Sequence, residues 1–352
     1  MQDRPEGVSE HELRRALARG WNLRPAALRY LPVGAGSYHW LARDPARDPG
    51  GRWFVTVDDL DGKSWLGGTR EDVYAGLGAA LGTARWLRDR AGLGFVVAPE
   101  PDRGGAAVHR LSPRYDLALY RYIEGSGWEF GDRLPPPVRD QLVDMLVVLH
   151  QVTPGPRVPV ARPDLPQRGI LAAALDDLGR PWSGGPFAEP ARALLAGAAS
   201  SVRGLLATFD RLAARVAAAP GQVITHGEPH PGNLLRTPGG LRLIDWDTVG
   251  LAVPERDLWL VLGAGSAEAG DMARRYTEAT GHPIDPDALR CYAIRWALDD
   301  LAAFTAELRA GHQRTAGTEA AWQALTGTVA GLGRLADHRP GPASDLSRLR
   351  LA

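Results

Sequence analysis

The feature of this sequence that most constrains its fold is a change in hydrophobic pattern near residue 125. Before it, short β-rich segments are separated by Gly, Pro and Asp, and after it long segments carry the apolar spacing of helices. This change predicts an α+β protein in which a small antiparallel sheet precedes a larger, mainly helical part. The expected strands are 28–33, 38–43, 52–57, 95–98 and 116–123, and a turn at 48–51 joins two of them.

Helical spacing recurs in both parts of the chain. Ser9 and Glu12 form a capping box for a helix that runs to about Arg19. Further helices are expected at 71–90, 138–150, 188–219, 267–280, 287–309 and 318–335, and one β island interrupts them at 222–225, 233–236 and 241–244. A chain of 352 residues exceeds the usual size of one domain. We therefore expect two lobes, 1–124 and 125–352.

Charge and apolar content exclude several classes of partner. Lys plus Arg and Asp plus Glu both number 41, and no basic run appears, which argues against a nucleic-acid partner. The polar N-terminus lacks the apolar centre of a secretory signal, and the longest apolar stretches fall far short of the roughly 20 residues of a membrane span. The single cysteine, Cys291, fits a reducing compartment as a buried small residue. We expect a cytoplasmic protein without a membrane partner, as a monomer or a homodimer.

Polar side chains gather in the β island. One loop holds His226, Glu228, His230 and Asn233, and Asp245 follows at the end of the next strand. Carboxylate and amide oxygens suit Mg²⁺, which binds proteins through one or two carboxylates plus substrate phosphates. A carboxylate three residues into the loop could accept a proton from an attacking hydroxyl, as phosphoryl transfer requires.

Three ordered motifs of the island are similar to those of one enzyme family. The run HGEPHPGN at 226–233 resembles the HGDxHxxN catalytic loop of aminoglycoside phosphotransferases, and IDWD at 244–247 resembles their IDW(D/E) metal-binding strand end. ERDL at 255–258 resembles the acidic motif downstream. The segment through residue 301 most resembles the spectinomycin phosphotransferase branch, and weaker similarity runs from about 28 to 335.

This resemblance implies a bilobal protein-kinase-like fold and ATP-dependent transfer of a phosphoryl group to a hydroxyl of a small molecule, with aminoglycoside or aminocyclitol antibiotics as candidates. It makes Asn233 and Asp245 the Mg²⁺ ligands and Glu228 the catalytic base. His226 is grouped with Glu228 as a catalytic-site residue of the same loop, with ordering of that loop as its expected role. Loop packing is the expectation for His230, and an internal salt-bridge and capping cluster is the expectation for Glu255, Arg256 and Asp257.

The nucleotide half is less regular. Gly34, Gly36 and Ser37 lie in a glycine-rich turn between two expected strands, where backbone N–H groups could approach the triphosphate. An ordinary flexible hairpin is the alternative. Tyr122 and Ile123 occupy the family's hinge position, where backbone groups pair with adenine.

Two residues depart from the family pattern. Thr56 stands where the third strand usually carries the lysine that holds the α and β phosphates, and Lys63, the only lysine of the N-terminal half, follows a few residues later. Lys63 could reach back to the phosphates, and an exposed turn lysine is the alternative. Glu228 replaces the usual aspartate, which moves the carboxylate by roughly 1.5 Å, and a misplacement of about 1 Å can cost about 100-fold in rate. We expect Asp58 and Asp59 to be surface or turn carboxylates.

The acceptor is expected to bind at the late helix. Asp299 and Asp300 could meet an ammonium group of an aminocyclitol, although Arg295 and Asp299 also have the spacing of a helix-surface ion pair. Aromatic walls or core packing are both open for the tryptophans Trp128, Trp182, Trp246 and Trp296.

Three functions remain open on these observations. The first is an active small-molecule kinase. The second is a pseudokinase or nucleotide-binding module with weak or no transfer, because Thr56 and Glu228 replace the usual residues. The third is a kinase-fold enzyme that modifies a peptide or a natural-product scaffold. Turnover of ATP separates the first from the second.

Overall fold

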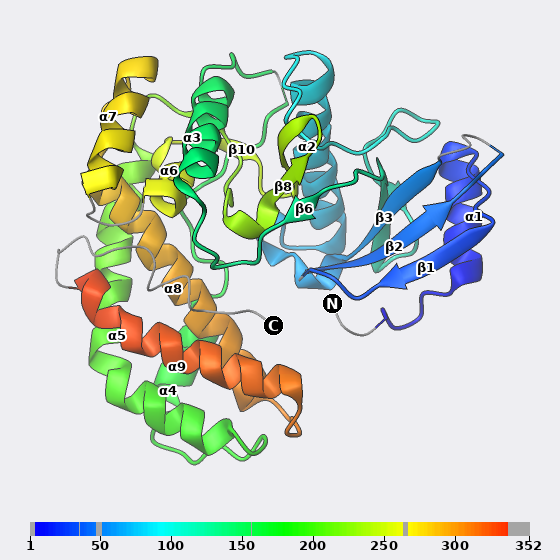
Figure 1. The fold of residues 1–352 in the computed structure, drawn as a ribbon. Coiled ribbons are helices and arrows are strands. Elements are labelled where there is room, and N and C mark those ends of the chain that lie inside the picture. Colours follow the sequence, from blue (N-terminus) through cyan, green and yellow to red (C-terminus); the bar gives the residue numbers. More distant parts are fainter. Residues whose placement is uncertain (1–3, 35, 47–50, 156, 263–266, 337–352) are drawn as a thin grey trace. The chain divides into compact units, whose positions relative to one another are not determined.

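The computed structural model describes residues 4–34, 36–46, 51–155, 157–262 and 267–336 (Figure 1). The chain forms two compact units. The first comprises Met1–Ser126, Thr153–Pro159 and Leu234–Gly250, and the second comprises Gly127–Val152, Val160–Asn233 and Leu251–Ala352. Two short strands lie where the chain passes from one unit to the other, β6 (Ser126–Gly127) and β10 (Gly250–Ala252).

The first unit is built on a five-stranded antiparallel sheet with the order β1-β2-β3-β5-β4. Four predicted strands are confirmed, and β4 adds a short pair at one edge. The predicted strand at 95–98 is wrong, because this apolar segment forms only an isolated parallel bridge between Val96 and Leu243. The predicted turn at 48–51 falls largely outside the described residues. The strands are β1 (Ala27–Leu31), β2 (Ser37–Arg43), β3 (Arg52–Asp59), β4 (His109–Arg110) and β5 (Tyr115–Arg121).

The two faces of this sheet differ in chemistry. Helix α1 (Glu10–Trp21), which opens with the predicted capping box, covers an apolar face (Figure 1). Because side chains alternate along a strand, the opposite face receives the intervening residues of β2, β3 and β5. The pairing register aligns Ser37 and Asp116 with Asp58 on that face. It also carries His39, Thr56, Ala118 and Tyr120.

After β3 the first unit continues through two short turns and a helix. The turns are 3₁₀ segments, η1 (Leu60–Gly62) and η2 (Ser64–Leu66), and they lead into α2 (Arg70–Asp89). A capping box between Thr69 and Asp72 starts α2. The hairpin β8 (Leu234–Thr237) and β9 (Gly240–Leu243) also belongs to this unit, and both of its strands were predicted.

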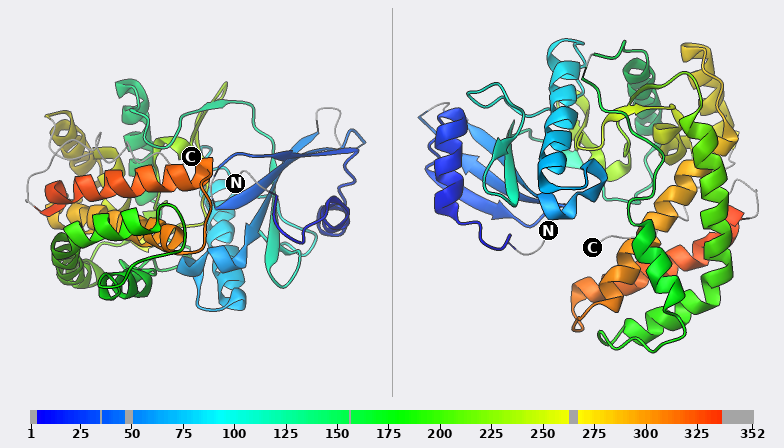
Figure 2. Two further views of the ribbon diagram at one scale, coloured as in Figure 1. Left: turned by 90° about the horizontal axis from the view of Figure 1, so that it is seen from below. Right: turned by 180° about the vertical axis from the view of Figure 1, so that it is seen from behind.

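The second unit is mainly helical, as predicted. Helix α8 packs against α4, α5, α6 and α9, and Figure 2 shows α9 crossing α5 and α8. Its core contains Leu171, Leu195, Leu298 and Leu325, together with the buried Cys291. The short helices α4 and α6 were not predicted. The elements are α3 (Pro136–His150), α4 (Arg168–Asp176), α5 (Ala188–Ala217), β7 (Val223–Thr225), η3 (Pro231–Asn233), α6 (Glu255–Leu262), α7 (Ala267–Thr280), α8 (Pro286–Arg309) and α9 (Ala316–Ala336).

Candidate functional site

The predicted site residues fall into two groups, one in each unit. The first unit holds the glycine-rich turn, Lys63, the 122–123 segment and Asp245, and the second holds the loop at 226–233 and the two carboxylates of α8. Among the described residues no group of three or more His, Cys, Asp or Glu side chains is arranged to hold a metal ion by itself.

Lys63 is the only lysine in the chain, against 40 arginines. Its side chain is 3% exposed, and Nζ lies 2.6 Å from Oδ2 of Asp247 and 3.1 Å from Oδ1 of Asp58. Burial acts to lower the pKa of Lys63, but the carboxylates of Asp247, Asp58 and Asp245 outweigh it and hold that pKa well above its usual value. The ammonium is therefore charged. We call Lys63, Asp58 and Asp247 the lysine cluster.

The lysine cluster corrects two expectations from the sequence. Lys63 is not an exposed turn lysine, and Asp58 is not a surface carboxylate, because both side chains are buried. The strand alternation explains Asp58, since it lies two residues after Thr56 and so points to the same face of β3. Asp59 points the other way and pairs with Arg114, with Arg114 Nη2 2.6 Å from Asp59 Oδ2.

The glycine-rich turn is tied to the lysine cluster. The hydroxyl of Ser37 donates a hydrogen bond to Oδ1 of Asp58. Gly34 and Gly36 have φ angles of 69° and 81°, a conformation that side chains other than glycine rarely adopt. Position 35 lies outside the described residues. Both glycines thus occupy backbone positions that other residues would strain, and the role of this turn at phosphates stays a prediction.

Thr56 and its neighbours form an uncharged part of the same sheet face. Thr56 Oγ1 lies 3.4 Å from Nδ1 of His39, and burial lowers the pKa of His39 to about 4. Across the sheet from Asp58, Asp116 is fully buried, and burial together with the charge of Asp58 raises its pKa well above the usual range. Positive charge near Asp116 comes from Lys63 and from Arg110, which pairs with Asp116 in the strand register.

Asp245 lies at a strained position just after β9. Its φ of 62° is left-handed, which is uncommon for a residue other than glycine and clusters at functional sites. The next side chain, Trp246, is 1% exposed and donates from Nε1 to the carbonyl of Leu243 at 2.8 Å. The buried indole anchors this turn, while Asp245 itself is exposed.

The 122–123 segment follows β5, and one of its backbone N–H groups already donates a hydrogen bond within the protein. The N–H of Tyr122 donates to the carbonyl of Arg52 at 3.0 Å, and the Arg52 guanidinium lies 4.5 Å from the centre of the Tyr122 ring. Because that N–H already has an acceptor, adenine would have to form its hydrogen bonds with the carbonyl of Tyr122 or the backbone of Ile123. The predicted pairing at Tyr122 and Ile123 stays a prediction.

In the second unit, one buried carboxylate holds the loop at 226–233. Asp257 is fully buried and accepts from the backbone N–H groups of His226 and Gly227 at 2.8 and 2.6 Å. His150 Nε2 lies 3.1 Å from the same carboxylate, and His150 Nδ1 lies 2.7 Å from the hydroxyl of Tyr276. Burial acts to raise the pKa of Asp257, but the hydrogen bond with His150 and nearby positive charge outweigh it and lower that pKa. The loop therefore starts from a rigid ionic anchor.

Gly227 leaves room for a buried guanidinium beneath the loop. Its φ is 101°, and a Cβ there would lie 2.5 Å from a terminal nitrogen of Arg256. Arg256 Nη1 donates to Thr225 Oγ1 at 2.8 Å. The backbone N–H of Glu228 donates to Nδ1 of the buried His226 at 3.2 Å. His226 thus orders the loop, and Glu228 is presented from a fixed backbone.

Asn233 ends the loop with its side chain in a defined orientation. Its Nδ2 donates to the carbonyl of Glu228 at 2.9 Å and lies 3.3 Å from Nε2 of His230. Both of these interactions use the amide nitrogen, which leaves Oδ1 as a possible metal ligand. Such an oxygen fits Mg²⁺. The other predicted ligand, Asp245, belongs to the first unit, and this pair of ligands stays a prediction.

Aromatic rings lie beside the loop. Phe130 and Trp296 stack with ring centres 5.7 Å apart and an 8° angle between planes, and His230 meets Phe130 edge-on at 4.8 Å. Burial lowers the pKa of His230 to about 4, so this ring is neutral. Trp296 is thus part of an aromatic group next to the loop, whereas Trp182 and Trp246 are core residues.

Both predicted carboxylates of α8 have raised pKa values. Burial raises the pKa of Asp299 to about 6, and the i,i+4 pair with Arg295 forms at 3.3 Å. Among the described residues Oδ1 of Asp299 has no hydrogen-bond partner. Burial, the charge of Asp299 and that of Glu228 raise the pKa of Asp300 to about 7. The carboxyl groups of Asp300 and Glu228 therefore share one electrostatic environment.

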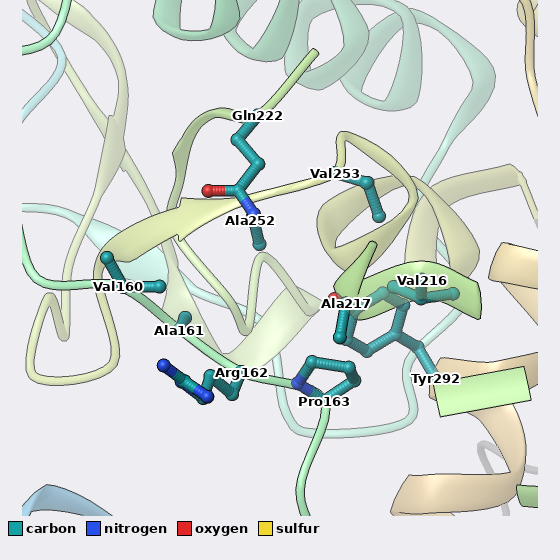
Figure 3. A pocket seen from close by; sticks show the side chains of 10 residues that line it. All are labelled: Val160, Ala161, Arg162, Pro163, Val216, Ala217, Gln222, Ala252, Val253 and Tyr292. Carbon is teal, nitrogen blue, oxygen red and sulfur yellow. The ribbon is translucent and has the colours of Figure 1, made fainter. Parts of the chain in front are cut away.

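A small cavity of about 190 Å³ lies elsewhere in the second unit (Figure 3). None of the predicted site residues lines it. Its walls are mostly apolar, and its polar residues are Arg162, Gln222 and Tyr292. The cavity is distinct from the loop and from the α8 carboxylates.

The sequence prediction missed Asp58 and His150. Asp58 could have been found from strand alternation, since it shares a face with Thr56 and precedes the one lysine of the chain. His150 had no such signal, because its partners Tyr276 and Asp257 are 126 and 107 residues away in sequence.

Comparison with known proteins gives a consistent result. Residues 34–294 match the family model APH, the phosphotransferase enzyme family. Protein StrN of Streptomyces griseus is 27% identical over 320 residues, which cover 85% of each chain. No helix within the described residues is long and apolar enough to cross a membrane.

Solved structures share the fold at low sequence identity. Spectinomycin phosphotransferase APH(9)-Ia, in complex with ADP and spectinomycin, has a TM-score of 0.71 and 16% identity over 94% of this chain and 99% of its own. Amicoumacin kinase hAmiN, in complex with AMP-PNP, Ca²⁺ and Ami, has a TM-score of 0.59 and 15% identity over 95% and 96%. The predicted kinase-like α+β fold is confirmed.

Proposed function

Because the chain belongs to the phosphotransferase enzyme family, we propose that it is an ATP-dependent kinase that phosphorylates a hydroxyl of a small cationic molecule. The observation that carries this proposal is the loop at 226–233. Asp257 clamps its backbone, and the loop then presents the carboxylate of Glu228 and the amide oxygen of Asn233. Phosphoryl transfer depends mostly on such positioning and on electrostatics.

Glu228 is the proposed general base. Its carboxylate would accept the proton of the acceptor hydroxyl as the oxygen attacks the γ-phosphorus, and the bond from that phosphorus to the leaving oxygen of ADP would break. The charge of Glu228 is one cause of the raised pKa of Asp300, so the two carboxyl groups lie close enough to interact. The longer side chain of Glu228 is supported by a backbone fixed through Asp257 and His226.

Asn233 and Asp245 are the proposed ligands of Mg²⁺. One amide oxygen and one carboxylate are a donor set that suits this ion when phosphates and water complete its coordination. The ion, when bound, supplies positive charge that offsets the charge developing on the transferring group. The left-handed backbone of Asp245, anchored by Trp246, supports a functional role for this turn.

The first unit is the proposed binding region for ATP. Lys63 would contact phosphate oxygens, and the backbone of the turn with Gly34, Gly36 and Ser37 would approach the triphosphate. The backbone at Tyr122 and Ile123 would pair with adenine. The presence of ADP in the spectinomycin phosphotransferase structure and of AMP-PNP in the amicoumacin kinase structure supports ATP as the donor.

Asp299 and Asp300 are the proposed contacts for a cationic acceptor. An ammonium group beside them would favour their ionised forms and gain charge-assisted hydrogen bonds. Trp296 and Phe130 offer an apolar face for a ring. These groups favour an aminocyclitol or amino sugar over a peptide scaffold. We propose that the partners are this acceptor and the nucleotide, and that the reaction takes place in the cytoplasm, where ATP is available.

The proposal is tested by ATP consumption with purified protein against spectinomycin, aminoglycosides, neutral sugars and amino alcohols, with product mass read at the end. We expect one cationic class to gain the mass of one phosphate, with a requirement for Mg²⁺. Neutral sugars are the matched control for charge. If the protein binds nucleotide and no acceptor is phosphorylated, the pseudokinase alternative replaces this proposal.

A further inference from the structure

We infer that Asp58 is a positioning residue that holds the ammonium of Lys63 for the phosphates of the nucleotide. The inference rests on the proposed function and adds a residue to it. Asp58 lies on β3, Lys63 on the turn that follows, and their charged atoms are 3.1 Å apart at 3% and 4% side-chain exposure. Asp247 completes the arrangement at 2.6 Å.

The geometry of an ammonium group leaves Lys63 one donor to spare. An ammonium has three N–H groups, and Asp58 and Asp247 are the two carboxylates within ion-pair distance among the described residues. The ring of Trp65 lies 5.2 Å from Nζ. Nζ donates a hydrogen bond to Asp247 and lies at ion-pair distance from Asp58, so an N–H remains that a phosphate oxygen could accept.

No carboxylate of helix α2 pairs with the ammonium of Lys63. In protein kinases the phosphate lysine pairs with a glutamate from the helix that follows. The acidic residues of α2 are Glu71, Asp72 and Asp89, at its two ends. Glu71 pairs with Arg110, Asp72 caps the helix, and Asp89 pairs with Arg88, so all three have other partners.

In this chain the strand supplies the carboxylate, and the lysine comes from the turn that follows the strand. Thr56 leaves the strand without the lysine, and two residues later on the same face the strand provides a carboxylate instead. The lysine then comes from the turn after the strand. Asp58 also accepts from Ser37, so one carboxylate fixes both the lysine and the glycine-rich turn.

The residue usage of the chain supports a specific need for an ammonium. With 40 arginines and one lysine, the chain uses arginine wherever a surface cation suffices. An ammonium is compact and directs its donors tetrahedrally, whereas a guanidinium is planar and larger.

The test measures the affinity for Mg·ADP by calorimetry in Asp58→Asn, Lys63→Met and the double variant. We expect at least tenfold weaker binding in each single variant, and the double variant within twofold of the weaker one, because Asp58 acts through Lys63. Asp59→Asn is the matched control on the same strand and should bind within twofold of wild type. Two results would overturn the inference. One is an affinity of Asp58→Asn for Mg·ADP within twofold of wild type, and the other is a loss of affinity in the double variant equal to the product of the two single losses.

If Asp58→Asn alone does not fold, the double variant carries the test, because it removes both charges of the pair. Its affinity should match that of Lys63→Met within twofold, and a further tenfold loss would overturn the inference. Failure of the wild-type protein to bind Mg·ADP would instead contradict the proposed function.

A second readout does not depend on nucleotide. Lys63 carries the only ε-amine of the chain. Brief acetylation of untagged protein can therefore modify two amines, that of Lys63 and the α-amine, and the intact mass measures how many acetyl groups have been added. Lys63 should acetylate at least tenfold faster in Asp58→Asn than in wild type or Asp59→Asn. Equal rates in all three proteins would show that Asp58 does not hold the ammonium.

Discussion

The two groups of candidate site residues, one in each unit, use a buried aspartate in opposite ways. In the first unit, Asp58 pairs with a side-chain cation that the proposed ligand must reach. In the second, Asp257 binds backbone N–H groups and His150, and it serves a loop whose other residues do the chemistry. The first arrangement fixes the position of a charged group, and the second fixes the backbone conformation of the loop at 226–233. A similar substitution in the two places should therefore damage different properties.

The largest effect is expected for Asp257→Ala. It leaves two N–H groups and His150 buried without their acceptor, and each buried hydrogen-bonding group left unsatisfied costs about 1–3 kcal/mol, so the three together cost at least about 3 kcal/mol. We expect the free energy of unfolding, measured with urea, to fall by that amount and turnover to be lost. Asp210→Ala is the control, since its pair with Arg168 is half exposed and such pairs contribute at most about 1 kcal/mol. Equal losses in both variants would remove the anchoring role of Asp257.

A smaller effect, confined to the nucleotide, is expected for Lys63→Arg. The charge is kept, but the planar guanidinium does not fit the space that Asp58 and Asp247 leave for an ammonium. The affinity for Mg·ADP should fall at least tenfold. Arg70→Lys, at the exposed pair with Asp61, is the reverse exchange and should leave it unchanged. Full affinity in Lys63→Arg would show that only the charge matters.

The smallest effect is expected for Asp300→Asn, which should increase the stability of the protein rather than lower it. Folding raises the pKa of Asp300 to about 7, so the native state binds a proton that the unfolded state releases above about pH 4. The resulting loss of stability begins near pH 4 and is complete above pH 7, and asparagine removes it. The melting temperature should thus rise, on the order of 4 °C at pH 8, and stay unchanged at pH 4.

The same variant should bind cationic acceptors more weakly at pH 8. Thermal melts and acceptor Michaelis constants at the two pH values measure both effects. A variant that is less stable than wild type at pH 8 would contradict the raised pKa of Asp300 in the folded protein. Asp210→Asn, at an exposed position, should show no pH-dependent change in melting temperature.

Sequence and structure agree best where information is local. The strands of the first sheet and the long helices follow from apolar spacing, and the loop at 226–233 from contiguous residues. The segment 95–98 shows the limit, because an apolar run cannot tell a strand from a buried segment that forms a single bridge at Val96. The lysine cluster needed contacts across 184 residues, between Lys63 and Asp247, which no local pattern contains.

The anchor in the second unit was predictable only in part. The motif at 255–258 indicated a capping cluster, and Asp257 indeed accepts backbone N–H groups of the loop. Its partner His150 lies on α3, and Tyr276 lies on α7, so the packing of three helices brings them together. The order of charged residues along the chain does not predict that these three side chains meet.

The central claim is that Glu228 does the chemistry while the first unit holds the nucleotide, and Glu228→Gln tests it most directly. Turnover with the identified acceptor and Mg·ADP affinity by calorimetry are measured on the same protein. We predict that kcat falls by about 100-fold to 10,000-fold, as for loss of a general base, with nucleotide affinity within twofold of wild type. An unchanged kcat, or a loss of nucleotide affinity equal to the loss of kcat, would contradict it.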